Sequence, residues 1–333
     1  MKSLRKLLLP FSVLYGLVTA VRNKLFDFGI LKSTRFSLPV IVVGNLSTGG
    51  TGKSPMVEYL IRNLKNDYKI GVVSRGYGRK TKGFLEVLPS NTAMEVGDEP
   101  LQIKKKFPEV IVAVSEKRAV GIEKIRKNTG VILLDDAFQH RSVKPGYSIL
   151  LTSYTDLYSD DFILPAGNLR ESSRGASRAD CIVVTKCPKL TESEMDGVEK
   201  RLNPKIGQDV FFSLISYGEK IMSANGAEAL EFLSTKTFLL VTGIANPTPL
   251  VDYLHSKNLK FTHRSFPDHH HFSEPELKEL DAQNIILTTE KDYVRLQPFL
   301  KNALLYYLPI EVSFLRDEKK FLSGVRDAIQ KYN

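Results

Sequence analysis

Residues 45–55, NLSTGGTGKSP, contain three glycines, a lysine and two serines, and they come one residue after an apolar run, PVIVV, at residues 39–43. The apolar run has the composition of a buried parallel strand. A strand, a glycine loop and a helix N-terminus together bind phosphate through free backbone N–H groups and the helix dipole. The strict motif has glycine where this chain has Ser47, but Lys53 can still reach the outer phosphates and Ser54 can bind Mg²⁺. The predicted nucleotide contacts are Gly49, Gly50, Thr51, Gly52, Lys53 and Ser54.

Two adjacent carboxylates follow a second apolar run, Val131 to Leu134, which is typical of a buried strand. Asp135 and Asp136 then lie at the carboxyl end of a parallel strand, where open α/β sheets bind their ligands. A carboxylate in that position binds Mg²⁺ directly or through water. A turn or a helix cap is the structural alternative, because aspartate is common in both. We predict a metal site, because the pair comes after a phosphate loop in the same chain.

Three further polar clusters contain side chains capable of chemistry. In GDEP, Asp98 and Glu99 precede a proline at an expected helix start, so helix capping competes with general-base function. In LPAGNLRE, Arg170 and Glu171 either meet a phosphate or a metal or form a surface ion pair. In FPDHHHF, residues 266–272, three histidines are consecutive, and a metal site competes with a solvated loop.

Helix-prone and strand-prone segments alternate along most of the chain, which predicts an α/β fold with a doubly wound parallel sheet of the P-loop NTPase type. Two β-prone runs at residues 209–224 interrupt the alternation and predict a hairpin linker. Beyond them a second, smaller α/β domain is expected, in which residues 303–312 form one strand. The predicted units are an N-terminal membrane-associating helix at 1–30, a nucleotide-binding domain at 31–208, the linker at 209–224, and a domain that closes a cleft at 225–333.

The first 30 residues begin with Lys2, Arg5 and Lys6 and continue with an apolar stretch from Leu7 to Val21. This stretch is shorter than the roughly 20 residues that a membrane-spanning helix needs. A secretory signal is excluded by the phosphate loop, because nucleoside triphosphates are not available outside the cell. An interfacial helix fits the basic flanks best, and a helix packed on the protein's own core is the alternative.

The chain of 333 residues has a net charge of +10 and a pI of about 9.3. An excess of basic residues implies an anionic partner, such as nucleic acid, a membrane surface or a phosphorylated substrate. The sequence has no long basic run, no RNA-binding aromatic signature and no zinc-finger spacing, so it does not favour nucleic acid. It indicates no obligate protein partner either.

Seven motifs, taken in order, resemble those of the tetraacyldisaccharide 4'-kinases, the lipid A 4'-kinases of Gram-negative bacteria. They run from Val43 to Asp292 and are VGNLSTGGTGKSP, SRGYGR, GDEP, DDAFQH, LPAGNLRE, FPDHHHF and TEKD. The resemblance implies transfer of the γ-phosphate of ATP to the 4'-hydroxyl of a lipid-linked glucosamine disaccharide, with Mg²⁺ as cofactor. It also implies a peripheral protein at the cytoplasmic face of the inner membrane, where the lipid substrate lies.

The same resemblance implies roles for individual residues. Asp98 would be the catalytic base, and His269 would pair with it from the second domain. Lys53 would offset negative charge on the transferring group. The expected substrate contacts are Arg75, Tyr77, Glu99 and Arg170, and the expected metal ligands are Ser54, Asp135, Asp136 and Glu171.

Two other functions are compatible with the residues alone. A soluble small-molecule kinase would use the same phosphate loop. A GTP-dependent metal-delivery protein would use the histidines of FPDHHHF as ligands, but it needs an Asn-Lys-x-Asp motif to read the base. The segment VTKCP supplies only Thr185 and Lys186 of such a motif, so ATP is favoured over GTP.

Overall fold

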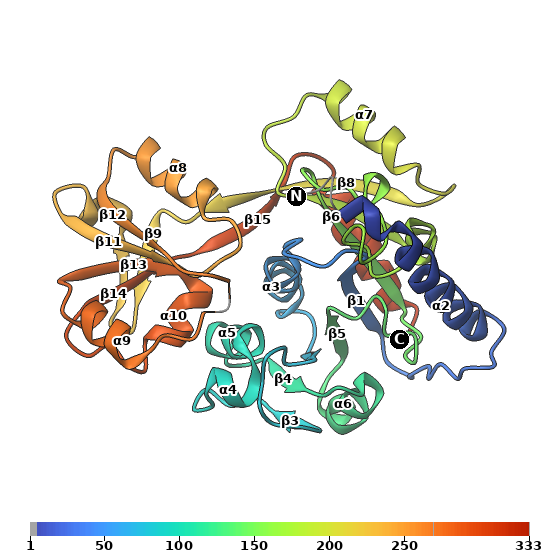
Figure 1. The fold of residues 1–333 in the computed structure, drawn as a ribbon. Helices are drawn as coiled ribbons and strands as arrows, with labels where there is room; N and C mark the ends of the chain where they lie inside the picture. Colours follow the sequence, from blue (N-terminus) through green and yellow to red (C-terminus); the bar gives the residue numbers. More distant parts are fainter. Residues whose placement is uncertain (1–4, 269, 333) are drawn as a thin grey trace.

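The computed structural model describes residues 5–268 and 270–332, and their strands form two sheets in separate lobes (Figure 1). In spatial order, the first sheet contains β15 (Ile310–Phe314), β8 (Asp209–Tyr217), β7 (Cys181–Thr185), β6 (Tyr147–Ser153), β1 (Val40–Asn45), β5 (Val131–Asp135), β2 (Ile70–Ser74), β4 (Ile111–Val114) and β3 (Leu85–Glu86). The second sheet contains β10 (Gly226–Ala229), β9 (Lys220–Ser223), β14 (Leu304–Leu308), β13 (Ile285–Thr289), β11 (Thr237–Thr242) and β12 (Lys260–Ser265).

Helices surround both sheets (Figure 1). The α-helices are α2 (Leu9–Asp27), α3 (Lys53–Leu64), α4 (Ala93–Val96), α5 (Asp98–Lys106), α6 (Arg118–Ile125), α7 (Glu192–Leu202), α8 (Thr248–Ser256), α9 (Glu274–Asp281), α10 (Glu290–Leu296) and α11 (Glu318–Gln330). Short 3-10 helices are η1 (Lys6–Leu8), η2 (Arg126–Asn128), η3 (Tyr158–Asp160), η4 (Ser173–Arg178) and η5 (Leu230–Leu233).

The central strands of the first sheet are apolar because both of their faces are covered. β1 pairs in parallel with β5 and β6, and β5 pairs in parallel with β2. Ile41 and Leu133 enter the core on one face, whereas Val42 and Leu134 enter the core on the other. Each such side chain contributes roughly 1.5–3 kcal/mol when it leaves water. The predicted doubly wound parallel sheet is therefore confirmed, with antiparallel β3 and β15 at its edges.

The order of these strands places the polar motifs together. β1 lies between β6 and β5, and Val43 of β1 pairs with Asp135 at the end of β5. Because parallel strands end at the same edge of a sheet, the loop after β1 and the two carboxylates at the end of β5 are neighbours.

The predicted hairpin at residues 209–224 is wrong, because its two halves belong to different sheets. β8 pairs in parallel with β7 in the first sheet, whereas β9 pairs with β10 in the second. The predicted single strand at residues 303–312 is also divided, at Pro309, into β14 and β15. The backbone N–H of Gly218 donates to the carbonyl of Pro309 over 2.9 Å, so β8 and β15 together form the connection between the lobes.

The C-terminal boundary of the predicted second domain also requires correction. β15 pairs antiparallel with β8 in the first sheet, and α11 follows it there. Phe321, Val325 and Ile329 of α11 are buried in the same core as Ile41. The second domain thus ends near residue 309, because the apolar face of α11 covers the first sheet.

Helix α2 has a small, polar face towards the protein and an apolar face away from it. Ser12 accepts a hydrogen bond from the backbone N–H of Ala166 over 3.0 Å, and Asn23 donates to Glu171 over 2.7 Å. The exposed apolar side chains of α2 are Leu9, Phe11, Val13, Leu14, Tyr15, Leu17, Val18 and Val21. This pattern contradicts the alternative of a helix packed on the protein's own core. No described helix is both long enough and apolar enough to cross a membrane.

Candidate active site

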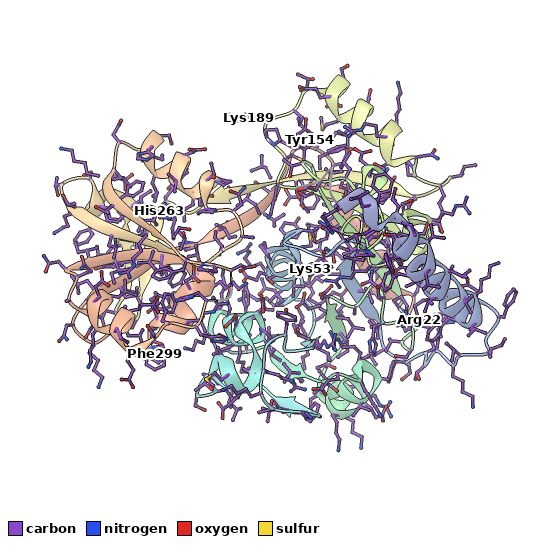
Figure 2. The ribbon with its side chains drawn as sticks, in the orientation of Figure 1. Arg22, Lys53, Tyr154, Lys189, His263 and Phe299 are labelled. Carbon is purple, nitrogen blue, oxygen red and sulfur yellow. The ribbon has the colours of Figure 1, made fainter. Side chains whose placement is uncertain are left out.

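The phosphate loop joins β1 to α3 as the sequence predicts. Gly52 has a φ of 81° and Gly49 a φ of 125°, and both backbone conformations favour glycine. Lys53 starts α3 in the middle of the molecule (Figure 2), where its Nζ lies 3.3 Å from Oδ1 of Asn45. The same Nζ lies 3.7 Å from Oδ1 of Asp136. Lys53 therefore points back towards the ends of β1 and β5.

Two residues that sequence reasoning considered only for GTP recognition hold the loop in place. The Oγ1 of Thr185 donates to the carbonyl of Thr51 over 2.8 Å, and Nζ of Lys186 donates to the carbonyl of Gly50 over 2.6 Å. Burial, and then the charge of Lys53, lower the pKa of Lys186. Thr185 is the last residue of β7 and Lys186 is the next residue, so their position at the end of an apolar strand was the signal available in the sequence.

Three buried polar atoms around the loop have no hydrogen-bond partner within the described residues. They are Nδ2 of Asn45, Oγ1 of Thr51 and Oδ1 of Asp135. Buried polar atoms are almost always paired, and leaving one unpaired costs about 1–3 kcal/mol. Donors and an acceptor without partners beside a helix N-terminus are what a polyphosphate and its cation require. The residues present thus fit a nucleotide with Mg²⁺.

The two adjacent aspartates have opposite electrostatic environments. Asp135 is buried and accepts a hydrogen bond from Oγ of Ser74 over 3.2 Å. Burial, reinforced by the charge of Asp136, raises the pKa of Asp135 to about 6. Burial also acts to raise the pKa of Asp136, but Lys53 and Arg170 outweigh it and the pKa is lowered. Arg170 contacts both oxygens of Asp136, at 3.0 and 3.3 Å.

This asymmetry predicts that two matched substitutions change the free energy of unfolding in opposite directions when the protein has no nucleotide or metal bound. The native pKa of Asp135 lies above its unfolded value, so its ionisation destabilises the fold as pH rises from about 4 to 6. We expect Asp135→Asn to raise the free energy of unfolding at pH 7.5 by up to about 3 kcal/mol, and by less at pH 5. Asp136→Asn should lower it at pH 7.5, because the lowered pKa of Asp136 stabilises the fold above its unfolded pKa. Denaturant titrations in EDTA at both pH values measure this, and destabilisation by Asp135→Asn at pH 7.5 would contradict it.

The contacts of Glu171 do not support its predicted role as a metal ligand. Its Oε1 accepts hydrogen bonds from Arg178 over 2.9 Å and from Gln139 over 3.2 Å. Its Oε2 accepts from Asn23 of α2 over 2.7 Å. A buried carboxylate held in this way connects α2 to the site, so we assign Glu171 to positioning. Gln139, which sequence reasoning did not single out, also donates to the carbonyl of Asn45 over 2.8 Å.

A buried arginine lies behind the aspartates and was also missed. Arg118 is 2% exposed, and its guanidinium donates to the carbonyls of Ser115 over 2.7 Å and Asp135 over 3.2 Å. Its backbone N–H donates to Nε2 of His140 over 3.3 Å. Burial, and then the charge of Arg118, lower the pKa of His140 to about 4. Neutral His140 and charged Arg118 thus hold the end of β5 in place through these hydrogen bonds.

The SRGYGR and GDEP motifs are packed together through their glycines. A Cβ on Gly97 would lie 3.1 Å from Cα of Gly76 and 3.1 Å from the carbonyl of Tyr77, so the two loops touch through backbone. Arg75 and Tyr77 are exposed beside this contact, and their role in binding substrate stays a prediction. Gly97, and not Asp98, is the N-cap of α5, and among the described residues no side chain forms a capping hydrogen bond to that helix. Helix capping therefore does not account for Asp98.

The GDEP motif meets the second domain through α10, which begins within the TEKD motif. Arg295 of α10 forms an ion pair with Asp98. Lys291 lies 3.3 Å from Glu99 and 3.2 Å from Asp268 of FPDHHHF, so it connects the two motifs. Asp98 and the FPDHHHF loop thus approach each other across the interface between the domains.

One histidine of FPDHHHF, His270, has structural contacts within the described residues. His269, the predicted partner of Asp98, lies outside the described residues. Nε2 of His270 lies 3.1 Å from the carboxylate of Glu276, and its ring stacks on Phe266. His270 therefore fixes the loop to the start of α9. In the part of the chain that the structure describes, no cluster of three or more His, Cys, Asp or Glu could hold a metal.

The family model described as tetraacyldisaccharide-1-P 4'-kinase matches residues 4–330. The chain belongs to this family. The tetraacyldisaccharide 4'-kinases of Flavobacterium johnsoniae and Flavobacterium psychrophilum are 49% and 50% identical to it, over 96% of this chain and 96% of each relative. The crystal structure of LpxK from Aquifex aeolicus in complex with ATP is 32% identical, with a TM-score of 0.80 over 98% of this chain and 99% of that chain.

These similarities confirm the family that the ordered motifs predict, together with the P-loop fold and the use of ATP. Membership of a tetraacyldisaccharide 4'-kinase family sets aside the two alternatives, a soluble small-molecule kinase and a GTP-dependent metal-delivery protein. The lipid disaccharide predicted as substrate also agrees with the family.

Proposed function

We infer that this chain transfers the γ-phosphate of ATP to the 4'-hydroxyl of a tetraacyldisaccharide 1-phosphate, a step of lipid A biosynthesis. The observation that carries the inference is the convergence of Lys53, Asp136 and Arg170 at the phosphate loop, with Asp98 at the adjoining domain interface. Phosphoryl transfer depends on positioning and on charge neutralisation, and these residues supply both.

In the proposed reaction, Asp98 accepts the proton of the 4'-hydroxyl as the hydroxyl oxygen forms a bond to the γ-phosphorus. The bond between the γ-phosphorus and the β,γ-bridging oxygen breaks, and ADP leaves with its electron pair. Lys53 and Arg170 offset the negative charge of the transferring group. Asp136 holds the side chains of Lys53 and Arg170 in place through its ion pairs with them. Ser54, Asp135 and Asp136 would hold Mg²⁺, which supplies further charge neutralisation when it is bound.

A comparison of acceptors with a free and with a phosphorylated 4'-hydroxyl tests this function. We expect the purified protein to consume ATP in the presence of a disaccharide 1-phosphate lipid with a free 4'-hydroxyl, and to yield a product one phosphate heavier. An acceptor already phosphorylated at the 4'-position should give no product. Phosphorylation of that second acceptor at another hydroxyl, found by tandem mass spectrometry, would contradict the assignment.

We also propose that α2 holds the enzyme at the cytoplasmic surface of the inner membrane as a peripheral protein. Phe11, Leu14 and Val18 are 63%, 61% and 60% exposed on the face of α2 that turns away from the protein. An apolar face with basic flanks favours the boundary between lipid head groups and acyl chains. The positive net charge of the chain favours an anionic leaflet.

Substitution of the exposed face tests this location. Joint replacement of Phe11, Leu14 and Val18 by asparagine should weaken binding to anionic vesicles at least about tenfold, because each side chain loses apolar area that the bilayer would bury. Phe299 is 58% exposed in the other lobe (Figure 2), and Phe299→Asn is the matched control. Vesicle co-sedimentation measures binding, and equal retention of the triple variant and the wild type would contradict the proposal.

A further inference from the structure

Arg295 connects the second domain to the carboxylate that we assign as the base. Arg295 lies on α10 and forms its ion pair with Oδ2 of Asp98, the first residue of α5. The two side chains are only 9% and 13% exposed, so water screens their attraction weakly. The pair joins residues that are far apart in the chain but meet where α5 and α10 pack together (Figure 1).

The guanidinium of Arg295 is itself held from behind by a fully buried carboxylate. Its Nη1 lies 3.3 Å from Oδ1 of Asp292. Oδ2 of Asp292 accepts hydrogen bonds from the backbone N–H of Gly243 over 2.8 Å and from Oγ1 of Thr289 over 2.7 Å. The position of Arg295 is therefore fixed by the ends of β11 and β13.

A further set of ion pairs across the same interface lies apart from the contact between Arg295 and Asp98. Lys106 of α5 lies 2.7 Å from Glu58 of α3 and 2.8 Å from Glu290 of α10. This buried triad already joins α5 to the second domain. Attachment of the domains thus does not by itself explain why Arg295 contacts Asp98.

We propose that Arg295 is a positioning residue, which orients the carboxylate of Asp98 towards the acceptor hydroxyl when α10 lies against α5. The proposal rests on the proposed function of Asp98 as base. An arginine fork that is fixed at one side restricts rotation of the carboxylate at the other. Proton transfer requires a base within hydrogen-bond reach and in the correct orientation, so a freely rotating carboxylate transfers the proton less efficiently. The second domain thereby orients the general base that belongs to the first domain.

Removal of the guanidinium tests the proposal. We expect Arg295→Ala to lower kcat about 10- to 100-fold with the KM for ATP nearly unchanged, because the phosphate loop is intact. Added guanidinium ion should restore at least part of kcat to Arg295→Ala and none to Asp98→Asn. Glu290→Gln is the matched control: it removes an interdomain ion pair away from Asp98 and should lower kcat less than threefold. Thermal melting of each variant verifies its fold.

A double-mutant cycle separates this proposal from the role of Asp98 itself. If Arg295 acts through Asp98, the loss from Arg295→Ala should largely disappear in the Asp98→Asn background. An undiminished loss in that background, or an equal loss in Glu290→Gln without guanidinium rescue, would overturn the positioning role. An unchanged kcat in Asp98→Asn alone would instead overturn the proposed base, whatever Arg295→Ala does.

Discussion

Replacement of Lys53 by alanine should lower kcat/KM for ATP-dependent lipid phosphorylation by at least about 10² to 10³, the loss expected when one preorganised charge is removed from a transition state. The Nζ of Lys53 lies at the start of α3 beside Asp136, where the outer phosphates of a nucleotide meet the helix N-terminus. Its loss also leaves the charge of Asp136 less balanced, which adds repulsion of the phosphates.

A control at the other end of the same helix separates this effect from stability. Lys65 is the C-cap of α3 and forms an exposed ion pair with Glu109 over 2.8 Å. Surface pairs of this kind contribute about 0–1 kcal/mol, so Lys65→Ala should leave kcat/KM within about twofold of wild type. Steady-state kinetics with purified acceptor lipid measure both variants. Similar rates for Lys53→Ala and Lys65→Ala would show that the loop does not hold the transferred phosphate.

Asp98→Asn should lower kcat about 10²- to 10⁴-fold, the usual contribution of a positioned general base. The amide keeps the shape of the side chain but accepts no proton from the acceptor hydroxyl at neutral pH. ATP is bound mainly by the loop after β1, so the affinity for ATP should stay within about threefold of wild type. Single-turnover kinetics and nucleotide titration of the same preparation separate the two quantities.

A different outcome for Asp98→Asn would assign Asp98 another role. A large loss of ATP affinity with unchanged single-turnover rate would assign Asp98 to domain contact through Arg295 and not to proton transfer. Asp98→Glu provides a further comparison, because it keeps the carboxylate but displaces it by one methylene. A general base that depends on its exact position tolerates that displacement poorly, since small errors in position greatly reduce proton transfer.

The parts of the site that could be predicted from sequence are those in which local pattern determines structure. The phosphate loop needs glycine at Gly49 and Gly52 because both have positive φ, and the glycines are visible in the sequence. The aspartates after β5 follow an uninterrupted apolar run, so their place at the sheet edge follows from the parallel strand. The order in which these and the other motifs occur along the chain was sufficient to indicate the family.

The contacts that sequence did not predict all join distant segments. The apolar strand before Thr185 and Lys186 places them at the edge of a sheet, but it does not show that they hold the carbonyls of the phosphate loop, because strand order brings β7 close. The contact of Arg295 with Asp98 depends on how two domains pack. The resemblance implies that Glu171 is a metal ligand, and nothing near Glu171 in the sequence shows that Asn23 of α2 and Arg178 contact its carboxylate instead.

The same limitation explains the error at the end of the chain. Residues 303–312 are apolar except for Glu311 and were therefore expected to form one strand. Pro309 has no backbone N–H to donate to a sheet, which makes it a natural boundary between β14 and β15. Periodicity cannot tell which sheet a strand joins, because both sheets offer similar apolar surroundings. The return of β15 and α11 to the first sheet was visible only in three dimensions.

Transfer of ³²P from γ-labelled ATP to a purified tetraacyldisaccharide 1-phosphate in mixed micelles would show directly whether the loop that contains Lys53 delivers phosphate to the lipid. Wild type, Lys53→Ala and Lys65→Ala should be assayed together with Mg²⁺ and with EDTA. The proposed function predicts labelled lipid from wild type and Lys65→Ala with Mg²⁺, and almost none from Lys53→Ala or in EDTA. Hydrolysis of ATP by wild type without any labelled lipid would contradict it.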